Sequence, residues 1–253
     1  MAALNIKSID FKMLSHLISP FEISETSLRT SLSRMVKKGL LSVEKNKKEA
    51  VYYRARKNNR ISSNISAPFT SPGKRGWDYD YWGVLYSVPG AEASPRHKIR
   101  KKLVAYRYGL WSPGLWIRPV LTGEKPYNGL EELSENPYCR LIRFTPDQKL
   151  KRDECSRIWH LEEKVEIMNK AIEKLKNAMS MISDSTPEAA FKFKMEIGES
   201  AVRALASDPL LPNEQLPEKW PAEELRELFG RWDNDITKIA EGFYIPILKG
   251  ESV

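Results

Sequence analysis

The chain has 253 residues, of which 41% are hydrophobic and seven are Trp, with a net charge of +8. This length is enough for two or three small domains with a core in each, and the composition indicates a globular protein. No apolar run approaches the roughly 18 residues of a membrane-spanning helix. The N-terminal stretch MAALNIKSIDFK lacks the pattern of a secretion signal. We therefore expect a cytoplasmic protein without a membrane helix.

The positive charge is concentrated at the N-terminus. Residues 1–60 contain 13 Lys and Arg against 5 Asp and Glu, whereas residues 61–253 contain 28 Lys and Arg against 28 Asp and Glu. Such an asymmetry is expected when one small module binds a polyanion and the remainder has another role. Double-stranded DNA is the polyanion that we expect.

The stretch SETSLRTSLSRMVKKGLL, residues 24–41, has the period of an amphipathic helix. Ser24 is expected to cap this helix and Gly39 to end it. The outer side carries hydroxyls near its start and cations toward its end, which suits phosphates and base edges but is also common on solvated helices. Four residues of the opposite side are expected to face the core: Leu28, Leu32, Met35 and Val36.

Residues 9–19 predict a shorter helix, and the sequence PFEIS makes the turn between the two helices. Residues 41–53 then predict a β-hairpin with a Lys-rich tip. Helix, turn, helix and basic hairpin form a winged helix, in which the second helix enters the major groove and the wing reaches the backbone. A small α/β domain with a lysine-rich loop is the alternative. The expected core residues of the first helix are Ile9, Met13, Leu14, Leu17 and Ile18.

Residues 57–76 are rich in Asn, Ser, Pro and Gly and mark a linker. After it, strands are predicted at 82–88, 114–119 and 138–145, with a helix over 94–109. Strand, helix, strand and later strand suggest a small ferredoxin-like α/β sandwich. The helix carries a basic run that either contacts DNA or an anionic ligand or, more commonly, is a solvated face. This run consists of Arg96, Lys98, Arg100, Lys101 and Lys102.

Residues 151–183 carry the longest periodic signal of the chain. Apolar residues at alternating spacings of three and four form a stripe that packs either on another helix of the same chain or on a second copy, and the period does not distinguish the two. Further helices are predicted after Pro187 and from about Ala222, so the last domain is expected to be helical. The stripe consists of Ile158, Leu161, Val165, Met168, Ile172, Leu175, Met179 and Ile182.

The sequence does not show the residue patterns of a metal site or an enzyme. Cys139 and Cys155 are expected to be reduced thiols. A metal-dependent nuclease would need a carboxylate where the first central strand ends. Asp78 and Asp80 lie before that strand instead. The three histidines stand at no metal-ligand spacing: His16, His97 and His160.

Four stretches of the chain resemble the PaaX family of bacterial repressors of phenylacetic acid catabolism. They are ISETSLRTSLSRMVKKGLL followed by YYR, then WDYDYW, GLWSPGLWIRP and DPLLPNEQLPEKWP. The resemblance covers nearly the whole chain. Family members have a further helix before the one predicted at 9–19, where this chain has only MAALNIKS, so its winged helix is either abbreviated or begins with a strand. The family's motif positions in the first stretch are Arg29, Thr30, Arg34, Lys37, Gly39 and Leu41.

The resemblance implies a winged helix, a central domain similar to a CRISPR-associated ferredoxin-like nuclease fold, and a helical C-terminal domain. It also implies a homodimer on palindromic operator DNA, released by an aryl-coenzyme A thioester such as phenylacetyl-coenzyme A. We therefore expect an α+β fold with a winged helix at 1–60, a linker at 61–76, a ferredoxin-like domain at 77–150 and a helical domain at 151–253.

The expected function is that of a non-enzymatic repressor, without a cofactor or metal, that dimerises through its C-terminal helices. Arg29 and Arg34 are the first candidates for DNA contact, because a guanidinium bridges guanine or clamps a phosphate. The full set of predicted DNA-binding residues is Thr26, Ser27, Arg29, Thr30, Ser33, Arg34, Lys37, Lys45, Lys47 and Lys48.

The alternative comes from another functional class. It is a protein that binds a ligand or a partner and has a weakened winged helix. Aromatic residues of the central domain would then line a pocket, although Trp and Tyr in strands more often belong to the core. No ligand-binding residue is assigned from the sequence. The aromatic residues concerned are Trp77, Tyr79, Tyr81, Trp82, Trp111 and Trp116.

Overall fold

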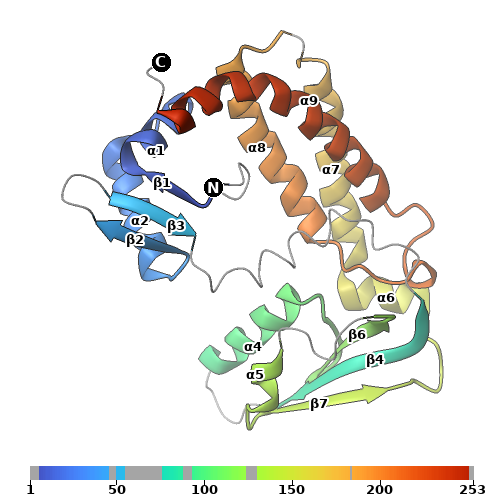
Figure 1. The fold of residues 1–253 in the computed structure, drawn as a ribbon. Coiled ribbons are helices and arrows are strands. Elements are labelled where there is room, and N and C mark those ends of the chain that lie inside the picture. Colours follow the sequence, from blue (N-terminus) through green and yellow to red (C-terminus); the bar gives the residue numbers. More distant parts are fainter. Residues whose placement is uncertain are drawn as a thin grey trace. The chain divides into compact units, whose positions relative to one another are not determined.

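The structure is a computed structural model (Figure 1), and it describes residues 6–45, 50–54, 76–87, 93–123, 130–182 and 184–250. The chain divides into two compact units. The helical unit comprises Met1–Ile65, Lys170–Arg203 and Glu224–Val253, and the sheet unit comprises Ser66–Asn169 and Ala204–Glu223. Segments far apart in sequence thus share a unit. The division into domains at 1–60, 77–150 and 151–253 stays a prediction.

The N-terminal part of the helical unit contains a three-stranded antiparallel sheet of order β1-β3-β2 and two helices. The helix predicted from residue 9 in fact begins at Phe11, because Ile9 pairs with Tyr52 in the sheet and is buried there. Asp10 caps the helix by accepting the Met13 N–H at 2.8 Å. The elements are β1 (Ser8–Asp10), α1 (Phe11–Leu17), the 3₁₀ helix η2 (Ser19–Phe21), α2 (Glu25–Lys37), β2 (Leu41–Lys45) and β3 (Ala50–Arg54).

Helix α2 begins and ends where its sequence predicts. The Ser24 hydroxyl accepts the Ser27 N–H at 3.3 Å, and Gly39 has the left-handed φ of 67°. Leu28 and Leu32 are buried. The prediction that Met35 faces the core is wrong, since 42% of its surface is exposed. Met35 lies at the edge of the apolar side, in the last turn of the helix.

The sheet unit contains a four-stranded antiparallel sheet of order β5-β6-β4-β7. The motif GLWSPGLWIRP forms a hairpin of two strands, where the sequence analysis predicted one. Gly114 in its turn has a φ of 82°. The elements are β4 (Trp77–Tyr86), α4 (Ala93–Ala105), β5 (Gly109–Ser112), β6 (Leu115–Leu121), α5 (Glu131–Ser134) and β7 (Cys139–Phe144).

The two faces of this sheet are covered by different parts of the chain. One face packs against α4 and α5 through a core that includes Ile99, Leu103 and Leu133. The other face packs against α6 (Arg152–Trp159) and the Pro-rich segment at residues 208–221. That segment contributes Leu211, Leu216 and Trp220 to the second core. The buried Gln215 side chain donates a hydrogen bond to the Tyr81 hydroxyl.

Three segments of the sheet unit meet beside Gly109. Trp159 Nε1 donates to the Arg107 carbonyl at 3.1 Å, and Arg107 Nε donates to the Asp208 carbonyl at 3.0 Å. A Cβ at Gly109 would lie 2.4 Å from the Ile158 side chain and 2.7 Å from Trp159. Only glycine allows this approach of β5 to α6.

The apolar stripe predicted over 151–183 lies on two helices. His160 has a φ of 53°, which ends α6 and separates it from α7 (Leu161–Met179). The side chains of Leu161, Met168 and Leu175 have no exposed surface, so the stripe packs within a single chain. Two long helices, α8 (Pro187–Ala206) and α9 (Ala222–Lys249), follow α7 in the chain (Figure 1).

Polar contacts join these helices in the interior and at the surface. The buried Lys194 of α8 pairs with Asp233 of α9 and donates to Thr237 Oγ1 at 2.7 Å. At the surface, Lys176 Nζ of α7 lies 2.8 Å from Glu224 Oε1 of α9. One turn before Lys194 on α8, the rings of Phe191 and Phe21 are 6.2 Å apart in an edge-to-face pair. This contact links η2 to the helices of the same unit.

Substitution of Gly109 tests the packing of α6 on the sheet. Gly109→Ala forces a methyl group into Ile158 and Trp159 and is expected to destabilise the protein by about 1–3 kcal/mol. Gly230→Ala is the matched control, because its Cβ would meet no atom within 4 Å on α9. The control is expected to stabilise the helix by up to about 1 kcal/mol. Urea unfolding followed by Trp fluorescence measures the stability of both variants. Equal unfolding midpoints for Gly109→Ala and the wild type would contradict the close approach of β5 to α6.

Candidate nucleic-acid interface

The outer face of α2 presents all of the side chains that were predicted there. We call this surface the α2 face. Each of its side chains is exposed, and none belongs to the core of the helical unit. The helix is anchored by its other side, through Leu28 and Leu32. The α2 face consists of Thr26, Ser27, Arg29, Thr30, Ser33, Arg34 and Lys37.

Arg29 is positioned by two neighbours. Its guanidinium carbon lies 3.7 Å from the centroid of the Phe11 ring, at the start of α1. Its Nη2 also lies 3.4 Å from Glu25 Oε2, one turn earlier on α2. Both partners of the ion pair are more than half exposed, so the pair contributes only a fraction of a kcal/mol. The Arg29 side chain remains 61% exposed and is therefore accessible to an anion. Phe11 was not identified from the sequence, because nothing in the sequence pattern predicts that its ring meets Arg29.

The remaining polar side chains of the α2 face are bound locally or not at all. The Thr30 hydroxyl donates to the Thr26 carbonyl at 2.9 Å, and the Ser27 hydroxyl accepts from Ser24 at 3.0 Å. Arg34 Nη2 lies 3.4 Å from Ser31 Oγ, a weak contact. Among the residues that the structure describes, Arg34 and Lys37 form no ion pair. Their charges are therefore available to a ligand.

The hairpin β2–β3 lies beside α2 in the sequence and carries the predicted wing. Lys45 is the last residue of β2, and its side chain is outside the described residues. Lys47 and Lys48 also lie outside them. On the hairpin itself, a hydrogen bond to Glu44 raises the pKa of Tyr53. This hydrogen bond joins β2 to β3 within the hairpin.

The carboxylate of Asp80, considered above for a nuclease, is bound to neighbouring side chains. Arg143 Nε donates to Asp80 Oδ2 at 2.8 Å, and the Thr145 hydroxyl donates to Oδ1. The hydrogen bond from Thr145, followed by that from Arg143, lowers the pKa of Asp80. These contacts tie β4 to β7 and its following residue. Asp78 is exposed on the same strand.

The aromatic residues considered for a ligand pocket are mostly packed in the two cores. Trp82 and Trp116 lie in the core under α4, and Tyr81 lies in the core under α6. Trp77 and Trp111 are half-buried against that second core. Tyr79 is exposed, and Lys149 Nζ lies 3.6 Å from the centre of its ring.

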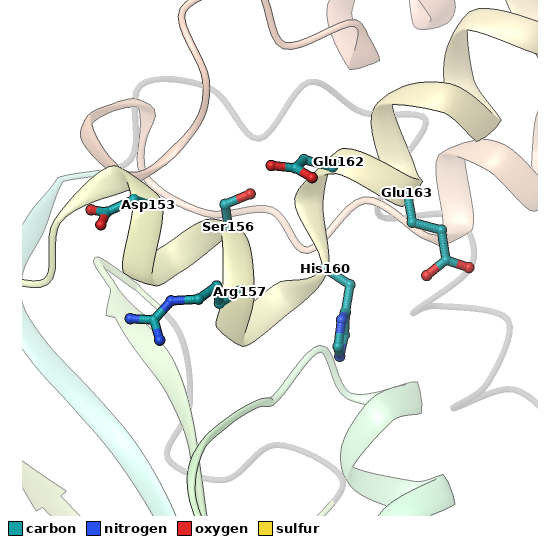
Figure 2. Close-up of a pocket in the computed structure, with 6 residues that line it drawn as sticks. All are labelled: Asp153, Ser156, Arg157, His160, Glu162 and Glu163. Atoms are coloured by element: carbon teal, nitrogen blue, oxygen red, sulfur yellow. The ribbon is translucent and has the colours of Figure 1, made fainter.

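An open hollow of about 610 Å³ surrounds the break between α6 and α7. In Figure 2, the side chains of Arg157 and His160 point below the ribbon, whereas those of Ser156 and Glu162 point above it. Because these side chains diverge, we assign no ligand to them. In the described ranges, no three His, Cys, Asp or Glu residues are grouped as a metal site would require. Likewise, none of the described helices is long and apolar enough to cross a membrane.

Both cysteines are free and buried. Burial raises the pKa of the Cys155 thiol to about 12, and it also raises the pKa of Cys139. The thiolate is the reactive form of cysteine, so these thiols are chemically quiet at neutral pH. The same second core contains Tyr81, where burial raises the pKa of the phenol.

Three family models match consecutive parts of the chain. They are the PaaX-like protein over residues 5–57, the PaaX protein central Cas2-like domain over 74–155 and the PaaX-like protein C-terminal domain over 159–245. The chain belongs to the PaaX family. The first PaaX match contains the α2 face, and the interval between the second and third matches falls just before the break at His160.

Two individual proteins are also similar to this chain. The transcriptional repressor PaaX of Escherichia coli strain K12 is 25% identical over 223 residues, which are 85% of this chain and 70% of that protein. A solved structure, the uncharacterized protein Rv0674 from Mycobacterium tuberculosis, matches with a TM-score of 0.58 and 22% identity, covering 92% of this chain and 90% of that one. This second match shows a shared fold.

Alkaline titration tests the burial of Cys155 and Tyr81. Between roughly pH 9 and pH 12 the unfolded chain releases both protons while the folded chain keeps them, so the free energy of unfolding is expected to fall as the pH rises. Urea unfolding at a series of pH values measures this. A midpoint that stays constant across the window would contradict it. As a control, alkylation by iodoacetamide should be slow in the folded chain and fast in urea.

Proposed function

We propose that this PaaX-family chain is a DNA-binding transcriptional repressor whose β1–β3, α1 and α2 form a winged helix. The supporting observation is the α2 face, an exposed surface of hydroxyls and cations on a helix anchored by its opposite side. A recognition helix needs this arrangement to reach base edges and phosphates. The family relationship and the charge surplus of residues 1–60 support the same function.

The two arginines of the α2 face have different surroundings. Arg29 lies in the first half of α2, the part of a recognition helix that approaches base edges, and Phe11 restricts its direction. Arg34 lies in the last turn and is held only weakly by Ser31. Either guanidinium can bridge the O6 and N7 atoms of guanine or clamp a phosphate. Thr26, Ser27, Thr30 and Ser33 would add shorter contacts, and Lys37 would add charge.

The wing would neutralise phosphates through Lys45, Lys47 and Lys48, which makes DNA affinity fall with salt. Strand β1 supports the proposed winged helix, since it completes a three-stranded sheet with β2 and β3. We therefore propose that the winged helix begins with this strand. This arrangement favours a winged helix that binds DNA over the alternative of a ligand-binding protein with a weakened winged helix.

The central elements follow the order β-α-β-β-α-β with strand order β5-β6-β4-β7, and we assign them to the ferredoxin-like class. We favour a binding role for this domain over nuclease activity, because Asp80 is engaged by Arg143 and Thr145. From the family resemblance we propose an aryl-coenzyme A thioester, such as phenylacetyl-coenzyme A, as the effector.

The proposed homodimer would bring two winged helices to half-sites about one DNA turn apart. The buried stripe of α7 is not available to a second copy, so a dimer through the C-terminal helices would use their outer sides. Met181, two residues after the end of α7, keeps 55% of its surface exposed. Light scattering that gives the mass of a monomer at micromolar concentration would contradict this proposal.

Substitutions on the α2 face separate base reading from charge. Arg34→Ala is expected to weaken binding to a duplex that the wild type selects from a random pool by about 1–3 kcal/mol and to affect a scrambled duplex less. The matched control is Arg203→Ala, which removes an exposed arginine that pairs with Glu199 on α8. Lys47→Ala should weaken both duplexes alike and reduce the salt slope by about one unit.

Fluorescence anisotropy measures these affinities. Equal losses on the selected and scrambled duplexes after Arg34→Ala would contradict a base-reading role for Arg34. A wild-type protein that enriches no sequence from the pool would contradict the proposed function itself.

A further inference from the structure

The solvent side of α4, in the sheet unit, carries a cationic surface that the proposed winged helix does not use. Five of the thirteen residues of α4 are Lys or Arg, and none is Asp or Glu. Ile99 and Leu103 are buried and hold the helix on the sheet, whereas Lys98, Arg100 and Lys101 are exposed. We call these three exposed cations the α4 face.

The three cations of the α4 face have no acidic partner among the described residues. Lys102, at the edge of the same helix, meets the carboxylate of Glu132. Several other exposed cations of the described chain also pair with acids. Such pairs are Arg143–Asp80, Arg152–Glu218, Lys176–Glu224, Arg203–Glu199 and Lys238–Asp235.

This arrangement costs stability that the fold does not require. Lys98 and Lys101 are one turn apart on the same side, and like charges at this spacing destabilise a helix by about 0.2–0.5 kcal/mol. Cations in the first turns also oppose the helix dipole. The packing of α4 depends on Ile99 and Leu103 and needs none of these charges. Residues 61–253 as a whole are electrically neutral, so the surplus on α4 is local.

We propose that the α4 face is a second DNA-binding surface, which contacts the phosphate backbone without reading sequence. This inference rests on the proposed DNA-binding function. Three cations within a rise of about 4.5 Å along the helix match the dense charge of a duplex, which carries one phosphate per about 1.7 Å of its axis. The face lacks a fixed hydrogen-bonding frame of the kind that reads bases, so its contribution is to affinity and salt dependence.

The test uses the full chain with Lys98, Arg100 and Lys101 all replaced by Ala. Anisotropy titrations over a range of salt would use the duplex selected by the wild type, flanked on each side by two further helical turns. Neutralisation of three phosphates predicts a salt slope shallower by about two to three units for this triple variant. The matched control removes three ion-paired cations of the helical unit through Lys176→Ala, Arg203→Ala and Lys238→Ala.

The outcomes separate this inference from the proposed function. A salt slope reduced in the α4 variant beyond the control, with discrimination between selected and scrambled duplexes kept, supports the α4 face. A slope equal to that of the control overturns it while the proposed function stands. If the wild type binds no duplex, both fail. Thermal melting of the α4 variant should be unchanged or higher, because the like-charge repulsion is gone.

Discussion

The four-stranded sheet has two apolar faces, and only one of them is covered by helices that connect its own strands. Helices α4 and α5 pack on one face, so the other must be covered by chain that follows β7. Helix α6 and the segment at 208–221 do this, and they bring residues more than 100 positions apart into one core, as the bond from Gln215 to Tyr81 shows. Residues up to Asn169 and the segment Ala204–Glu223 therefore belong to the same unit as the sheet.

This requirement explains the unusual backbone of the sheet unit. Arg107, His160 and Leu210 all adopt left-handed conformations, which cost about 1–3 kcal/mol each in residues other than glycine. Hydrogen bonds hold two of these turns in place. Arg107 is held through its carbonyl by Trp159, and the Leu210 N–H is bound by the Asp208 carboxylate at 3.0 Å. The turn at His160 then starts α7, which continues into the helical unit.

Local sequence signals predicted those parts of the structure that local interactions decide. The cap at Ser24, the end of α2 at Gly39 and the hairpin at 41–53 depend on neighbours within a few residues. Ile9 was misassigned to a helix, because its strand exists only through pairing with β3. The periodic stripe concealed the break at His160, since the apolar spacing continues across it. Covering of the second sheet face depends on contacts distant in sequence, which no periodicity reveals.

The candidate site shows the same division. The exposure of the α2 side chains follows from the helical period, so the sequence predicted which residues the face presents. The contact between Phe11 and Arg29 joins two helices and required the structure. The cations of α4 were visible in the sequence as a run. The structure adds that Ile99 and Leu103 hold the helix on the sheet, whereas Lys98, Arg100 and Lys101 are exposed and form no ion pair in the described chain.

The proposed repressor recognises particular DNA sequences and releases them in response to a ligand. The most direct measurement is anisotropy of the purified protein with DNA from its own upstream region and with a scrambled duplex, followed by addition of phenylacetyl-coenzyme A. We expect preferential binding to the upstream DNA and its reversal by the thioester. Equal weak binding to both duplexes, unchanged by the thioester, would contradict it.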